Sequence, residues 1–110
     1  MDSATGIQYD GLFPERVEKT LPPLYSNENK SPEETTVQVK FFNASGVGTW
    51  YATEYDAENK MFFGWVDGLG YPELGYFSLA ELQGYDGPFG LGIERDILFS
   101  PTPLSKVMGG

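Results

Sequence analysis

Residues 37–67 read VQVKFFNASGVGTWYATEYDAENKMFFGWVD and contain three runs rich in β-branched and aromatic residues. The runs cover 37–42, 49–56 and 61–67, and apolar and polar residues alternate at the start of the first, as in a half-buried strand. The short segments between them are polar or contain glycine, as hairpin turns do. The sequence therefore predicts an antiparallel meander of three strands.

Large apolar side chains fall on both predicted faces of this meander. In the second run, strict alternation puts Tyr51 and Tyr55 on one face and Trp50 and Ala52 on the other. A sheet that is apolar on both faces must be covered twice, or it leaves one aromatic face for a partner. We therefore expect a binding surface made of five aromatic residues, Trp50, Tyr51, Tyr55, Trp65 and Tyr71.

Two short helices are expected, one before and one after the meander in the sequence. Pro14 suits the first position of a helix over 14–21. Ser78 and Glu81 have the spacing of a capping box, in which each side chain accepts a hydrogen bond from the backbone of the other, so a helix is expected over 79–84. Both helices are short, so their stability must come from packing against the sheet.

The remaining signals complete an α+β domain. Short strands are expected over 74–77 and 93–99, and Thr102 is expected to cap a last helical turn. The predicted fold is thus an antiparallel sheet of four to five strands with two or three short helices packed on it. The predicted division of the chain is a flexible segment over 1–11, a single domain over 12–107 and a flexible tail over 108–110.

The charge balance restricts the class of partner. Sixteen acidic and seven basic residues give a net charge of −9. Such a surface repels nucleic-acid phosphates and anionic membranes over a Debye length of about 8 Å. The basic residues are scattered and form no stripe of the kind that binds DNA or RNA. We therefore expect no direct nucleic-acid or membrane binding, and a protein partner of basic character.

The chain contains no cysteine and no histidine. It therefore has no disulfide framework, no thiolate nucleophile and none of the commonest zinc ligands or general bases. No catalytic residue, cofactor or metal ligand is predicted. The first residues lack the basic and apolar regions of a signal peptide, and no apolar run approaches the length of a membrane span, so the cytoplasm is the expected compartment.

Acidic residues supply the best candidates for chemistry. Carboxylate pairs can bind Mg²⁺ or Ca²⁺ through oxygen, or can share acid and base roles when burial separates their pKa values. Structural and solubility roles are nevertheless favoured, because Asp-Gly pairs are common in turns and Arg95 can pair with acids across strands. The candidate acidic cluster consists of Glu54, Asp67, Glu73, Glu94 and Asp96.

Several segments, in this order, resemble a bacterial family of unknown function, DUF2958. They include Leu21-Pro22-Pro23-Leu24-Tyr25, WYATEYD over 50–56 and GLGIERD over 90–96. The resemblance covers roughly residues 12–107. It implies a small α+β domain that is often carried on plasmids and other mobile elements, and it implies no activity.

The sequence leaves three functions open. The leading hypothesis is a non-catalytic protein-binding module associated with mobile elements, because an aromatic sheet lies under an acidic surface without a catalytic motif. The first alternative is an acidic DNA mimic that blocks a host defence enzyme, which requires carboxylates in a row about 7 Å apart, like strand phosphates. The second alternative is a divalent-metal hydrolase that uses the candidate acidic cluster.

Overall fold

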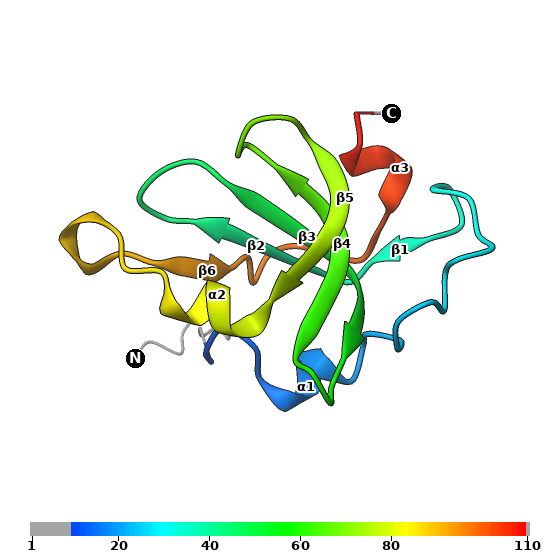
Figure 1. Cartoon of the computed structure of the whole chain (residues 1–110), viewed down its shortest axis with the longest axis horizontal. Helices are drawn as coiled ribbons and strands as arrows, with labels where there is room; N and C mark the ends of the chain where they lie inside the picture. Colours follow the sequence, from blue (N-terminus) through cyan, green and yellow to red (C-terminus); the bar gives the residue numbers. More distant parts are fainter. Residues whose placement is uncertain (1–9, 110) are drawn as a thin grey trace.

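The computed structural model describes residues 10–109, so most of the predicted flexible segment 1–11 and the end of the predicted tail 108–110 lie outside the described residues. The chain forms an α+β fold with a five-stranded antiparallel sheet in the order β5-β4-β3-β2-β6, which confirms the predicted fold class (Figure 1). The strands of this main sheet are β2 (Val39–Asn43), β3 (Thr49–Asp56), β4 (Met61–Asp67), β5 (Glu73–Ser78) and β6 (Ile93–Arg95).

A small second sheet and three short helices complete the fold. Strands β1 (Thr36–Val37) and β7 (Thr102–Pro103) pair antiparallel with each other. The helices are α1 (Glu15–Glu18), α2 (Leu79–Gly84) and α3 (Leu104–Val107), and a 3-10 turn, η2, covers Pro88–Gly90. Among the described residues, no helix combines the length and the apolar character that crossing a bilayer requires.

The predicted capping box of α2 is present. The Ser78 hydroxyl accepts a hydrogen bond from the Glu81 backbone N–H at 2.9 Å, and Glu81 Oε1 accepts one from the Ser78 backbone N–H at 3.0 Å. Helix α1 is shorter than the predicted segment 14–21, because after Glu18 the chain continues as a tighter turn in which the Leu21 N–H donates to the Glu18 carbonyl.

Two predictions near the C-terminus were wrong. The last strand of the main sheet ends at Arg95 and does not continue to residue 99, because Asp96 begins a turn in which its Oδ1 accepts from the Leu98 N–H at 3.0 Å. Thr102 does not cap a helix; it pairs with Val37 in the small sheet, and Pro103 precedes α3.

One face of the main sheet holds the hydrophobic core. Phe62 is fully buried at its centre, with its ring centroid 5.3 Å from that of Phe41 and 5.2 Å from that of Phe77. The segment around α1 and helix α2 cover this core face, and Figure 1 shows both helices at the same end of the sheet. The covering residues that pack into the core are Leu12, Phe13, Val17, Leu21, Leu79 and Leu82.

A β-bulge in β3 changes which side chains share a face. Ala52 lies opposite Gly64, but Glu54 lies opposite Phe63, so Thr53 is an extra residue in β3. An extra residue reverses the alternation beyond it. The prediction that Tyr51 and Tyr55 share a face is therefore wrong, because Tyr55 turns onto the core face.

Candidate functional site

The face of the main sheet opposite the core contains a groove of about 340 Å³, bounded on its other side by the segment 25–35 and α3. The register explains its floor, because Phe63 on β4 lies between Glu54 on β3 and Tyr76 on β5. The residues that line this groove include Tyr25, Glu54, Phe63, Leu74, Tyr76 and Leu104.

Glu54 anchors one wall of the groove. The residue is only 5% exposed, and both carboxylate oxygens accept backbone hydrogen bonds, Oε1 from the Tyr25 N–H at 2.9 Å and Oε2 from the Asn27 N–H at 2.8 Å. A buried carboxylate is stable when it accepts such bonds, and charge-assisted bonds are the stronger kind. Glu54 therefore fixes the segment at Tyr25 to the bulge of β3.

This anchor holds Tyr25 in an unusual backbone conformation. Its φ of 72° lies in the left-handed region, which costs a residue with a side chain roughly 1–2 kcal/mol. The bond to Glu54 offsets this cost, while the Tyr25 side chain remains largely exposed. Strained residues that the surrounding contacts enforce occur preferentially at binding and active sites.

Tyr25 and Tyr76 meet at the groove. A hydrogen bond with the Tyr25 phenol, together with partial burial and the nearby Glu54 carboxylate, raises the pKa of Tyr76. The Tyr76 ring packs edge-to-face on Phe63 with centroids 5.0 Å apart. Three aromatic rings and a carboxylate thus converge, a combination that attracts cations through the negative faces of the rings.

The predicted aromatic surface is divided between the two faces of the sheet. Tyr51 and Trp65 are half-buried neighbours on the groove face, and Tyr71 is 93% exposed in the loop between β4 and β5. Tyr55, in contrast, is 6% exposed in the core because of the bulge, and Trp50 packs against the core from the same face. Neither Tyr55 nor Trp50 can therefore belong to one surface with Tyr51 and Trp65.

Sequence reasoning missed most of the groove. Alternation along β5 could have placed Leu74 and Tyr76 together on the groove face, but only a short strand was predicted there, without a binding role. No local sequence pattern predicts that Tyr25 lies in the same groove as Tyr76. Tyr25 is held there by the hydrogen bond from its N–H to Glu54, which lies 29 residues further along the chain.

The structure does not bring the candidate acidic cluster together. Glu73 and Glu94 lie on the two outer strands, β5 and β6, four strand spacings or roughly 19 Å apart. Asp67 ends β4 opposite Thr49, Glu54 is bound to the Tyr25 segment, and the Asp96 carboxylate lies 3.5 Å from the Lys40 ammonium. Within residues 10–109, no three His, Cys, Asp or Glu side chains are grouped so that they could hold a metal ion.

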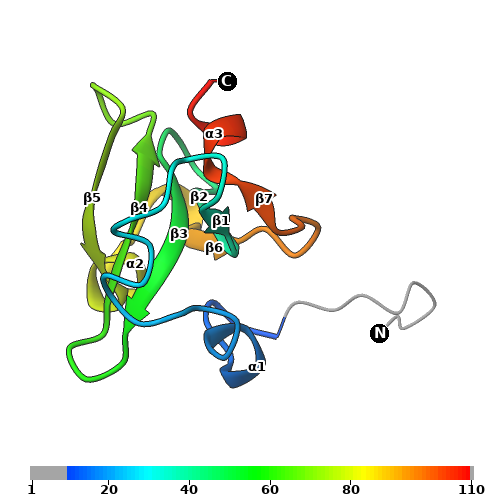
Figure 2. The ribbon, with the colours of Figure 1, turned by 90° about the vertical axis from the view of Figure 1, so that its right-hand side faces the viewer.

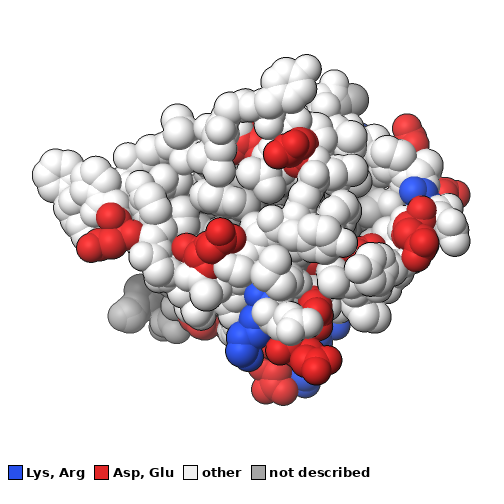
Figure 3. Space-filling model, viewed as in Figure 1, with Lys and Arg blue, Asp and Glu red and all other residues white. Residues whose placement is uncertain are grey.

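The acidic residues are also spread over the surface that Figure 3 presents. They form separate groups, and basic residues lie among those around α1 at the bottom of the view. A mimic of strand phosphates needs a continuous row. This face therefore offers no such row.

We expect Glu54→Gln to destabilise the fold by about 2 kcal/mol, because the amide cannot accept both backbone hydrogen bonds and places an N–H₂ against an N–H. Urea unfolding would measure the loss. Glu28→Gln is the matched control, because Glu28 also lines this cavity but is exposed, and its replacement should stay within about 0.5 kcal/mol. Equal unfolding midpoints for the two variants would contradict the anchoring role of Glu54.

Comparison with known proteins gives one match. Residues 13–108, nearly the whole chain, match the model of a family described as "Protein of unknown function (DUF2958)". No curated protein and no solved structure matches the chain.

Proposed function

We propose that this chain, which belongs to the DUF2958 family, is a non-catalytic module that binds a basic segment of another protein in the groove. The observation that carries the proposal is the strained backbone of Tyr25, held by Glu54 so that the exposed Tyr25 side chain lines the same groove as Tyr76. A site whose side chains are already ordered loses less entropy on binding.

The chemistry of the groove suits an ammonium or guanidinium group. Tyr25, Phe63 and Tyr76 supply ring faces, and a cation over an aromatic ring gains about 0.5–2 kcal/mol, depending on how far it is desolvated. The same sheet face already has such a contact, because the Lys40 ammonium lies 5.9 Å from the centroid of the Tyr51 ring. The Glu54 carboxylate adds attraction for a positive charge.

The overall charge supports the same partner. A net charge of −9 steers basic molecules toward the protein and raises their rate of association. At the rim, Glu28 and Lys30 carry opposite charges and offset each other, so the charge within the groove comes from Glu54.

Strand β5 offers a way to hold an extended partner. It is an outer strand of the main sheet, and Figure 2 shows it at the margin of the fold. Leu74 and Tyr76 on this strand are 42% and 53% exposed, and both line the groove. An extended segment that pairs with β5 could therefore place one basic side chain in the groove, which is recognition by strand addition.

The cellular setting is part of the proposal. Carriage on bacterial mobile elements follows from the family resemblance, and a cytoplasmic location is supported by the absence of cysteine. The acidic DNA mimic and the divalent-metal hydrolase stay predictions, and no contact in the groove favours either of them.

The proposal predicts selective binding of a short Thr-rich peptide with a central lysine or arginine. In an NMR titration of the ¹⁵N-labelled protein, the backbone resonances of Tyr25, Leu74 and Tyr76 should shift together. Replacement of the central residue by methionine or glutamate should weaken binding about tenfold or more, because the cation–aromatic contact is lost.

Tyr76→Ala should weaken binding of the lysine peptide by a similar factor. Tyr71→Ala is the matched control, because Tyr71 is also an exposed tyrosine but does not line the groove. Equal affinity for the lysine and glutamate peptides, or equal losses from Tyr71→Ala and Tyr76→Ala, would overturn the proposal.

A further inference from the structure

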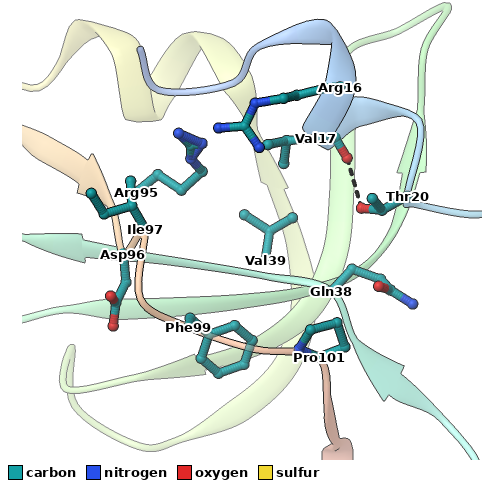
Figure 4. Close-up of a pocket in the computed structure, with 10 residues that line it drawn as sticks. All are labelled: Arg16, Val17, Thr20, Gln38, Val39, Arg95, Asp96, Ile97, Phe99 and Pro101. Atoms are coloured by element: carbon teal, nitrogen blue, oxygen red, sulfur yellow. Dashed lines mark hydrogen bonds between the residues drawn. The ribbon is translucent and has the colours of Figure 1, made fainter. Parts of the chain in front are cut away.

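A second cavity, of about 190 Å³, shares no lining residue with the groove. It lies between α1 and the segment after β6, and its apolar lining includes Val39, Phe99 and Pro101 (Figure 4). Two guanidinium groups face this space, Arg16 from α1 and Arg95 from β6, and Figure 4 shows them pointing toward each other.

Both arginines bind one carboxylate, that of Asp10. Asp10 Oδ2 accepts from Arg16 Nε at 2.9 Å and lies 2.8 Å from Arg16 Nη2, while Asp10 Oδ1 pairs with Arg95 Nη2. Burial alone would raise the pKa of Asp10, but the hydrogen bond from Arg16 and the charges of both arginines lower it below its usual range. The carboxylate is thus held as an anion between two cations.

The position of Arg95 is unusual for a charged residue. It lies opposite Phe41 in the sheet register, and its side chain is only 4% exposed. An apolar residue at such a position commonly gives equal or greater stability than a buried ion pair. The stability of the fold therefore does not by itself require an arginine at this position.

The acidic residue next to Arg95 in the sequence, Asp96, directs its carboxylate to other partners. Asp96 also lines the cavity, but its carboxylate lies 3.5 Å from Lys40 Nζ and accepts from the Leu98 N–H. Figure 4 shows that carboxylate directed away from the two guanidinium groups. Asp10 thus reaches Arg95 across 85 positions of sequence, although Asp96 is its immediate neighbour.

We propose that Arg16 and Arg95 form a binding site for the oxyanion of a ligand, a carboxylate or a phosphate group, and that Asp10 occupies this site in the free protein. Guanidinium forks match the paired oxygens of both groups. Val39, Phe99 and Pro101 would contact the apolar part of the ligand. The bound ligand displaces Asp10, so the surroundings of Asp10 and of the adjacent Gly11 change when the site is filled.

An NMR titration of the full chain with inorganic phosphate, and separately with acetate, tests this site. In the unmodified protein, the Arg95 Nε–H resonance and the Gly11 amide resonance should shift with one common dissociation constant, because filling the site releases Asp10. The anion that binds more tightly identifies which oxyanion the site prefers.

Asp10→Asn removes the internal competitor and should tighten binding of the preferred anion at least tenfold. Asp86→Asn is the matched control, because it changes the net charge equally at an exposed position outside the cavity. Adding Arg95→Met to Asp10→Asn should abolish the gain.

Equal affinities for Asp10→Asn and Asp86→Asn would overturn the proposal. If Asp10→Asn does not fold, the unmodified protein decides: an Arg95 resonance that neither anion moves, or one that moves without Gly11, overturns the proposal as well. These results leave the groove proposal unaffected, because the two cavities share no residue.

Discussion

Gly64→Ala is expected to leave the protein unfolded under conditions in which the parent chain is folded. A Cβ at this position of β4 would overlap the carbonyl oxygen of Tyr51 and would lie 2.8 Å from the Tyr51 carbonyl carbon and 3.0 Å from Ala52 Cα. These are backbone atoms of β3, so the overlap can be removed only by separating β4 from β3 next to the bulge. A cost above about 4 kcal/mol is comparable to the whole stability of a small domain.

Circular dichroism and urea unfolding would measure this effect. Gly75→Ala is the matched control, because Gly75 lies directly opposite Gly64 on β5 but a Cβ there meets nothing within 4 Å. That variant should unfold within about 0.5 kcal/mol of the parent. A Gly64→Ala protein with the unfolding midpoint of Gly75→Ala would show that β3 and β4 are not packed as described.

Phe62→Ala is expected to lower the free energy of unfolding by about 3–5 kcal/mol, because it leaves a large cavity in the centre of the core. The Phe62 side chain is fully buried, and its ring centroid lies 4.9 Å from that of Phe13 and 4.7 Å from that of Tyr55. It therefore joins the segment before α1 to the strand that carries the bulge. Chemical denaturation with an unchanged m-value would confirm a loss of native-state packing.

The adjacent residue, Phe63, provides a control that should affect binding more than stability. Phe63 is half-buried on the groove face and packs on Tyr76. Phe63→Ala should cost less than half of the stability lost in Phe62→Ala, but it should weaken binding of the lysine peptide. Equal destabilisation by the two substitutions would contradict the assignment of the core to the face that carries Phe62.

The sheet face of Tyr55 was the main failure of sequence reasoning, whereas Trp50 and Ala52 share a face opposite Tyr51 as predicted. Simple alternation placed Tyr55 with Tyr51, and this would hold for a regular strand. The extra residue, Thr53, reverses the alternation, and its hydroxyl donates to the Phe63 carbonyl at 3.1 Å. The residues around Thr53 carry no glycine or proline to mark a bulge, so the register of β4 was needed to find it.

The charged residues show the same limit. The sequence grouped Glu54 with other acids as a possible ligand set, whereas its partners are the backbone N–H groups of Tyr25 and Asn27. Arg95 was expected to pair with acids across strands, and one carboxylate that it binds is that of Asp10, ahead of the first helix. In both cases the interaction joins segments that are far apart in the chain.

Local sequence was enough to place strands β2 to β4, their turns and the capped start of α2, because these features depend on neighbouring residues and on alternation within single strands. It wrongly joined Val37 to the first of these strands, whereas Val37 pairs with Thr102 in the small sheet. Only the folded chain could decide the face of Tyr55, the strained backbone of Tyr25 and the pairing of Arg95 with Asp10. These three features arise from strand register and from contacts across long stretches of chain, which no short window of sequence encodes. Both proposed binding sites depend on such contacts.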